Sequence, residues 1–92
     1  KQNTVELVCS KGILDAVIDK FGSEITLVNN DVDSFIAVIN VYLSDILIKW
    51  IIQNGDNVYV KSPVSLRNRV MDKVTSIKKL YDRNRLQIDY IQ

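Results

Sequence analysis

The segment WIIQNGDNVYVKSPVSLRNRV, residues 50–70, combines the end of one helix, a turn, a short strand and the start of another helix. Gly55, between Asn and Asp, is typical of a helix C-terminus, because glycine adopts the left-handed conformation there without a steric penalty. Valines that alternate with other residues predict a strand over residues 57–61. Ser62 and Pro63 then predict a new helix, with the serine as its N-cap and the proline at its first position.

Four further elements are predicted upstream of this segment. Residues 4–10 alternate between apolar and polar side chains, which predicts a strand, and residues 12–21 have the spacing of an amphipathic helix. The β-rich runs 24–29 and 34–43 are joined by a polar turn and therefore predict a hairpin. A second helix follows, with Ser44 as its N-cap.

Two of the predicted helices carry apolar residues at spacings of three and four, which places these residues on one face of each helix. The inner face expected for the helix after Ser44 comprises Ile46, Leu47, Trp50 and Ile51. The corresponding residues of the final helix, which begins at about residue 63, are Leu66, Val70, Val74, Ile77 and Tyr81.

The predicted order of elements, β-α-β-β-α-β-α, indicates an α+β fold, a ferredoxin-like β-α-β-β-α-β sandwich with an additional C-terminal helix. In that topology the first and third strands are central. We expect one domain over residues 1–82, including the final helix, and a tail of undetermined structure over residues 83–92. Within the tail, residues 86–91 either extend the helix or form a short strand.

The order and spacing of residues 43–82 resemble the C-terminal extension of bacterial WYL-domain transcriptional regulators. The resemblance is carried by Trp50, Ile51, Ile52, Gly55, Asp56, Val58, Val60, Pro63, Leu66, Arg67 and Tyr81. It extends, with the upstream strand and helix, over roughly residues 3–82.

The resemblance implies a protein with a winged helix-turn-helix that binds DNA and a WYL domain that senses a ligand. The single cysteine, which has no partner for a disulfide within the chain, predicts a cytoplasmic location. The C-terminal extension of such regulators mediates dimerisation and packs near the partner's sensor domain. Neither the winged helix nor the WYL motif is present in these 92 residues. We therefore expect a fragment of a longer protein, a homodimer that contacts a neighbouring WYL domain and reaches DNA only through the winged helix.

The composition argues against several other classes of protein. The chain has no histidine and one cysteine, Cys9, which lies in phase with the apolar residues of its strand and is expected to be buried. There is no glycine-rich phosphate loop and no histidine to serve a serine or cysteine nucleophile, and without histidine the common metal-binding patterns are absent, so we expect no enzyme, no metal and no cofactor. The longest apolar run, residues 35–43, is interrupted by Asn40 and is too short to span a membrane.

The predicted sheet has an apolar face that the two helices of the sandwich do not cover. Its residues are Val8, Val28, Ile36, Val38, Tyr42 and Tyr59. An apolar patch of this kind is normally covered, either by the C-terminal helix or by a dimer partner or neighbouring domain. RNA-binding sheets of similar topology stack bases on aromatic residues, but here the first strand offers only Glu6 and Val8 at those positions.

Charge is distributed unevenly along the chain. Residues 62–85 have seven basic and two acidic residues, a net charge of +5, whereas residues 1–61 have a net charge of −3. Arg67, Arg69 and Lys73 are therefore candidates for binding an anionic ligand or an acidic surface. The alternatives are a solvated helix face and self-association between the basic helix of one copy and the acidic hairpin of another.

These observations predict a non-catalytic dimerisation and regulatory module of a ligand-responsive bacterial transcriptional regulator. The alternatives are a small-molecule or nucleotide-sensing ferredoxin-like module and a weak RNA- or single-stranded-DNA-binding module.

Overall fold

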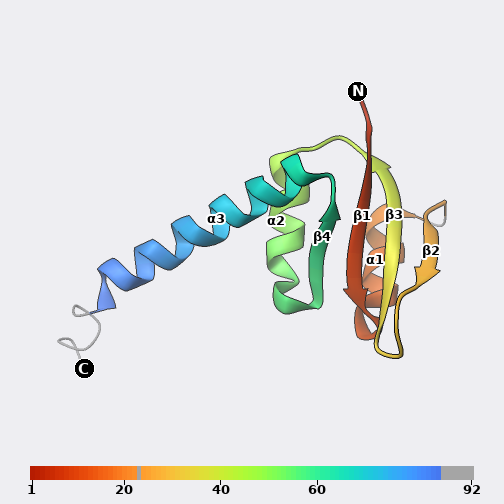
Figure 1. Cartoon of the computed structure of the whole chain (residues 1–92), viewed down its shortest axis with the longest axis horizontal. Helices are drawn as coiled ribbons and strands as arrows, with labels where there is room; N and C mark the ends of the chain where they lie inside the picture. Colours follow the sequence, from red (N-terminus) through yellow and green to blue (C-terminus); the bar gives the residue numbers. More distant parts are fainter. Residues whose placement is uncertain (23, 86–92) are drawn as a thin grey trace.

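The computed structural model describes residues 1–22 and 24–85, which form four strands and three α-helices (Figure 1). The strands are β1 (Asn3–Ser10), β2 (Thr26–Asn29), β3 (Ser34–Val41) and β4 (Val58–Ser62). The helices are α1 (Leu14–Phe21), α2 (Asp45–Gln53) and α3 (Val64–Arg83), and short 3-10 turns occupy Lys11–Ile13 and Gly55–Asn57. The expectation for residues 86–91 lies outside the described residues.

The four strands form one antiparallel sheet in the order β2-β3-β1-β4. The predicted α+β class is confirmed, and β1 and β3 are the inner strands, as expected. β1 pairs with β3 over its whole length, from Asn3 opposite Val41 to Ser10 opposite Ser34. This pairing fixes which residues share each face of the sheet, because side chains alternate along a strand.

The core lies between one face of the sheet and the helices. Val5, Leu7 and Cys9 alternate along β1 and are fully buried, together with Val17 of α1 and Leu66 of α3. The same cluster includes Phe35, Ala37, Ile39, Leu47, Ile48, Ile51, Val58 and Val60. Because these residues come from every element except β2, the cluster joins both inner strands and all three helices in a single core.

Two predicted helix ends are confirmed. The Ser44 hydroxyl accepts a hydrogen bond from Leu47 N at 3.2 Å and so caps α2. α1 ends at Gly22, whose backbone has φ +87° and whose N–H donates to Ile18 O at 2.8 Å. Both contacts satisfy backbone groups that a helix leaves unpaired at its ends.

The predicted cap of α3 is wrong. Ser62 is the last residue of β4, and its hydroxyl donates to Glu6 Oε2 of β1 at 3.3 Å. α3 begins at Val64, close to the predicted residue 63, and no side chain caps its first turn. The reason is the sheet register, which places Ser62 opposite Glu6.

The predicted inner face of α2 is partly wrong. Leu47 and Ile51 are buried as expected, and the half-buried Trp50 packs edge-on against Phe21 with ring centroids 5.0 Å apart. Ile46, however, is 68% exposed, and Ile48 is buried in its place. The cause is α3, which packs against α2 and so covers a side of that helix that a simple two-layer sandwich leaves open.

α3 docks only through its first turns. It contacts β4 and α2 near its start and then runs away from the sheet (Figure 1). Leu66 is its one buried residue, and Val70 is half-buried. α3 therefore does not cover the apolar face of the sheet that the two sandwich helices leave open, and that explanation for the patch is wrong for this helix. No helix in the described ranges is both long enough and apolar enough to cross a membrane.

Candidate interaction surfaces

The apolar face of the sheet contains a continuous row of side chains. Val28 of β2 lies opposite Ile36 of β3, Ile36 opposite Val8 of β1, and Val8 opposite Tyr59 of β4. Val38 lies in the next row, opposite Glu6. The structure therefore brings five of the six predicted face residues together on the sheet.

The accessible part of this row is concentrated at its two ends. Val8 and Ile36, on the inner strands, are only 7% and 9% exposed, whereas Val28 and Tyr59, on the edge strands, are about half exposed. Tyr42, the sixth predicted residue, follows the end of β3 and is exposed. A shallow apolar strip thus crosses the sheet, with one tyrosine at its β4 edge.

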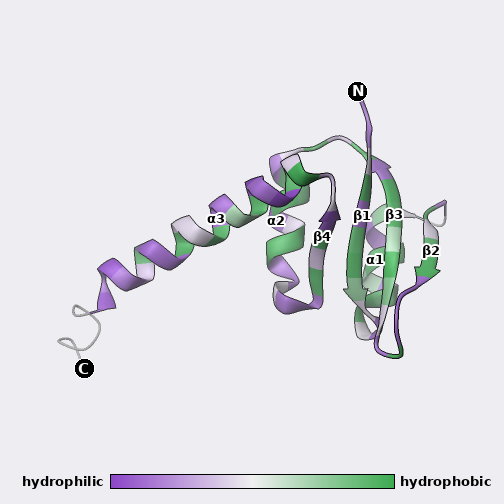
Figure 2. Cartoon of the chain, in the orientation of Figure 1, coloured by the Kyte–Doolittle hydropathy of each residue, from purple (hydrophilic) through white to green (hydrophobic). Residues whose placement is uncertain are grey.

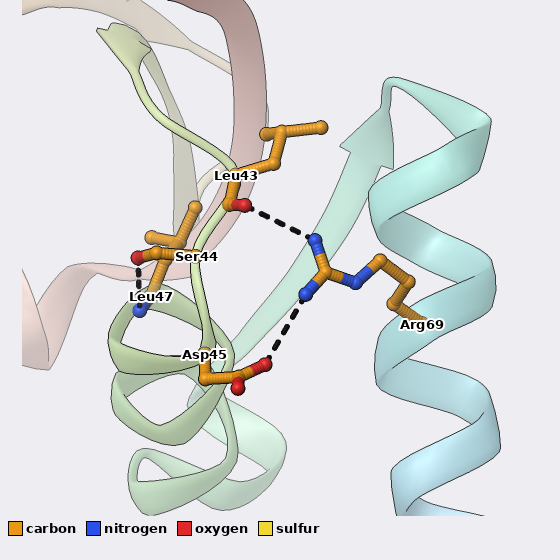
Figure 3. A network of polar contacts seen from close by, with 5 residues as sticks. All are labelled: Leu43, Ser44, Asp45, Leu47 and Arg69. Carbon is orange, nitrogen blue, oxygen red and sulfur yellow. Dashed lines mark hydrogen bonds and ion pairs between the residues drawn. The ribbon is translucent and has the colours of Figure 1, made fainter.

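Arg69 has a structural contact that the sequence did not indicate. Its guanidinium donates from Nη1 to Leu43 O at 3.1 Å and from Nη2 to Asp45 Oδ1 at 3.2 Å (Figure 3). Asp45 occupies the first turn of α2, where a carboxylate is favoured by the helix dipole. Arg69 therefore joins α3 to the start of α2.

The three predicted anion-binding residues do not converge. Arg69 and Lys73 line a hollow of about 510 Å³ between α2 and α3, together with Lys49 and the carboxylates of Asp45 and Asp72. Arg67 lines a groove on another side of α3. The structure therefore brings two of the three together, in a hollow of mixed charge.

The distal part of α3 forms a surface that the sequence predicted as a buried helix face. Hydrophobic residues recur along the helix after it has left the body (Figure 2). We call the exposed set the α3 stripe: Met71, Val74, Ile77, Leu80 and Tyr81. Their exposed fractions range from 39% for Ile77 to 65% for Tyr81. The spacing predicted Val74, Ile77 and Tyr81 as part of an apolar face but did not include Met71 and Leu80, and it did not show that the body ends before this face.

An apolar groove adjoins the α3 stripe. It has a volume of about 740 Å³ and opens between α3, α2 and the edge strand β4. Its walls are Ile51 and Ile52 of α2, Val58 and Val60 of β4, and Val70 and Val74 of α3. Because Met71, Val74 and Ile77 belong to both, groove and stripe form one continuous apolar surface.

The polar and nucleophilic groups of the body serve structural contacts. Burial raises the pKa of the Cys9 thiol to about 11, so the thiol is protonated at neutral pH. At the tip of the β2–β3 hairpin, the pKa of Asp31 is lowered by hydrogen bonds from the Ser34 hydroxyl and the Asp33 backbone. No group of three or more potential metal ligands occurs among residues 1–22 and 24–85.

No protein-family model, curated protein or solved structure matches this chain. The functional assignment therefore rests on the residues and their geometry.

Proposed function

We propose that the chain is a non-catalytic dimerisation module, and that its α3 helix is the pairing element. The observation that carries the proposal is the course of α3, which leaves the body after Val70 with the α3 stripe uncovered. Monomeric proteins rarely leave contiguous apolar surface of this kind in water, and such surfaces mark interaction sites.

The composition of α3 supports a need for a partner. Isolated helices of about 12–15 residues are marginal in water even for alanine-rich sequences, and most helical stability in proteins comes from packing of the apolar face. The distal half of α3 contains Val74, Thr75 and Ile77, β-branched residues with modest helix propensity. Packing of the α3 stripe against another surface would stabilise the distal half of the helix beyond what its helix propensity provides.

The resemblance of residues 43–82 to WYL-type regulators supports a role for this module in a ligand-responsive transcriptional regulator. The sheet order β2-β3-β1-β4, with helices on one face, supports a ferredoxin-like sandwich as its body. In this proposal the module holds two sensor domains in register. Ligand binding then changes the spacing of the paired DNA-binding domains by favouring one arrangement of the dimer.

The sheet row gives this module a second contact surface. Val28 and Tyr59 are the accessible ends of a strip that none of α1, α2 and α3 covers. We assign this strip to the neighbouring sensor domain, which in a full regulator lies beside the module. Pairing through α3 and docking through the sheet then use neighbouring surfaces that meet at Tyr59, which also lines the groove beside α3.

Light scattering over a concentration series tests the pairing. We expect the wild type to be a dimer and Ile77→Asp to be a folded monomer, because the substitution places two charges in the apolar contact. Ser76→Asp is the matched control: it introduces the same charge one residue away, beside the mixed-charge hollow, and should leave the dimer intact.

The sheet face is tested in parallel with Val28→Asp combined with Val38→Asp, two residues that lie on this face. A wild type that stays monomeric at every concentration contradicts the proposal. A dimer that survives Ile77→Asp and is lost in the sheet variant would move the pairing surface to the sheet. Circular dichroism confirms that each variant is folded.

A further inference from the structure

The spacing of apolar residues along distal α3 has the geometry of a two-helix seam. Val70, Val74, Ile77 and Tyr81 follow one another at intervals of four, three and four residues, the alternation that keeps side chains facing a partner helix. Polar residues, Arg67 and Asn84, occupy the next positions of this repeat at either end. The seam therefore has four apolar layers.

The flanks of this seam carry one lysine and one apolar residue on each side. Met71 and Lys78 flank it on one side, and Lys73 and Leu80 flank it on the other. In a pair of helices, residues at these positions contact the partner helix along the edges of the seam, and their charges favour either a parallel or an antiparallel orientation. Their arrangement discriminates between a parallel and an antiparallel pair.

A parallel pair would oppose like charges. In that orientation a flanking residue meets the residue five positions further along the partner helix, on the opposite flank. Lys73 would therefore meet the partner's Lys78, and two-fold symmetry would repeat the contact on the other side. Like charges in direct opposition destabilise an interface.

An antiparallel pair removes this conflict. Val74 then faces the partner's Ile77, and Val70 faces the partner's Tyr81. Each flank meets the same flank of the partner, so that Lys78 lies beside the partner's Met71 and Lys73 beside the partner's Leu80. A lysine stem packs well on an apolar side chain while its ammonium group stays in water.

The groove supports the same orientation. With Val70 opposite the partner's Tyr81, the last turn of the partner helix lies beside the body, where the groove of about 740 Å³ opens. The groove's walls are apolar, and Arg67 and Asp56 line it with opposite charges. In this register Tyr81, in the last turn of the partner helix, faces Val70, which lines the groove. The apolar groove of one copy thus receives the apolar side chain at the helix end of the other.

We propose that two copies of this chain pair through α3 in antiparallel orientation, with Val74 opposite the partner's Ile77 and the end of each α3 in the partner's groove. This inference rests on the proposed dimerisation and specifies its geometry. The two-fold arrangement fills both grooves with the same residues.

A charge exchange measured by analytical ultracentrifugation tests the register. Met71→Lys places two lysines side by side at both ends of the pair, and we expect it to raise the dimer dissociation constant at least tenfold. Adding Lys78→Glu replaces this repulsion with an ion pair and should return the constant to within about threefold of wild type. Residues 71 and 78 lie about 10 Å apart along one helix, so restoration reports a contact between chains.

The control is Ser76→Lys, which adds the same charge beside the mixed-charge hollow and should leave the dissociation constant unchanged. Restoration of dimerisation in the Met71→Lys, Lys78→Glu variant supports the antiparallel register. A dimer whose dissociation constant is unchanged by Met71→Lys overturns the proposed register but not the proposed dimerisation. A dimer tightened by Lys73→Glu, with no restoration in the double variant, would indicate a parallel pair and also overturn it. A wild type that is monomeric throughout overturns both.

Discussion

Leu66→Ala should remove the principal anchor of α3. The Leu66 side chain is 0% exposed and belongs to the same core as β1 and α2. Truncation to alanine removes three carbon atoms from this core, about 2.4 kcal/mol at ~0.8 kcal/mol per carbon. The cavity left behind adds to this loss, and buried Leu→Ala changes cost about 2–5 kcal/mol in total. We expect the free energy of unfolding to fall by about 3–4 kcal/mol.

Leu80→Ala is the matched control, because it makes the same chemical change in the same helix at a side chain that is 49% exposed. Its cost should be within about 0.5 kcal/mol at concentrations where the chain is monomeric. Urea unfolding followed by the fluorescence of Trp50, the single tryptophan, measures both variants. Equal midpoints for the two variants would refute the assignment of Leu66 as the anchor.

Two further predictions concern the body. Gly22→Ala should destabilise the chain by about 1–3 kcal/mol, because φ +87° and ψ 179° form a region essentially restricted to glycine. Gly12→Ala, which has open space and no positive φ, should change thermal stability far less; equal effects would argue against the strained turn. Because the pKa of Cys9 is raised to about 11, a disulfide reagent at pH 8 should find about a hundredfold less thiolate than at the ordinary pKa of 9.0. Native labelling should therefore be at least that much slower than labelling in urea, and equal rates would contradict burial. The raised pKa stabilises the fold below about pH 9, and this contribution is lost as the pH rises through 11.

The sequence predicted most of the elements because their local patterns are strong. Alternating residues identified β1 and β4, and Ser44 and Gly22 marked helix ends through contacts within four residues of themselves. Most residues of the open sheet face could also be predicted, because side chains alternate between the two faces of a strand and the strand order was expected. Local pattern was sufficient wherever the deciding contact was itself local.

The predictions that were wrong depend on contacts between residues that lie far apart in the sequence. Ser62 donates to Glu6, 56 residues away in the chain, and nothing in the surrounding sequence specifies that partner. Ile48 is buried instead of Ile46 because α3 packs on α2, a placement that helix periodicity does not encode. The stripe of α3 was recognised as apolar, but only the three-dimensional arrangement shows that the body ends before the stripe does.

Two contacts at the base of α3 determine how its distal half is presented. Leu66 contributes most of the energy, because it is fully buried, whereas the Arg69–Asp45 ion pair is largely exposed and is worth at most about 1 kcal/mol. Arg69 nevertheless helps to fix the orientation of α3, because its guanidinium also donates to the Leu43 carbonyl and so joins α3 to the segment between β3 and α2. Leu66 and the half-buried Val70 lie on one side of the helix, and the polar contact of Arg69 on another side restricts rotation about them. In the proposed dimer, the angle between α3 and the sheet is therefore the quantity that relates the positions of the two bodies.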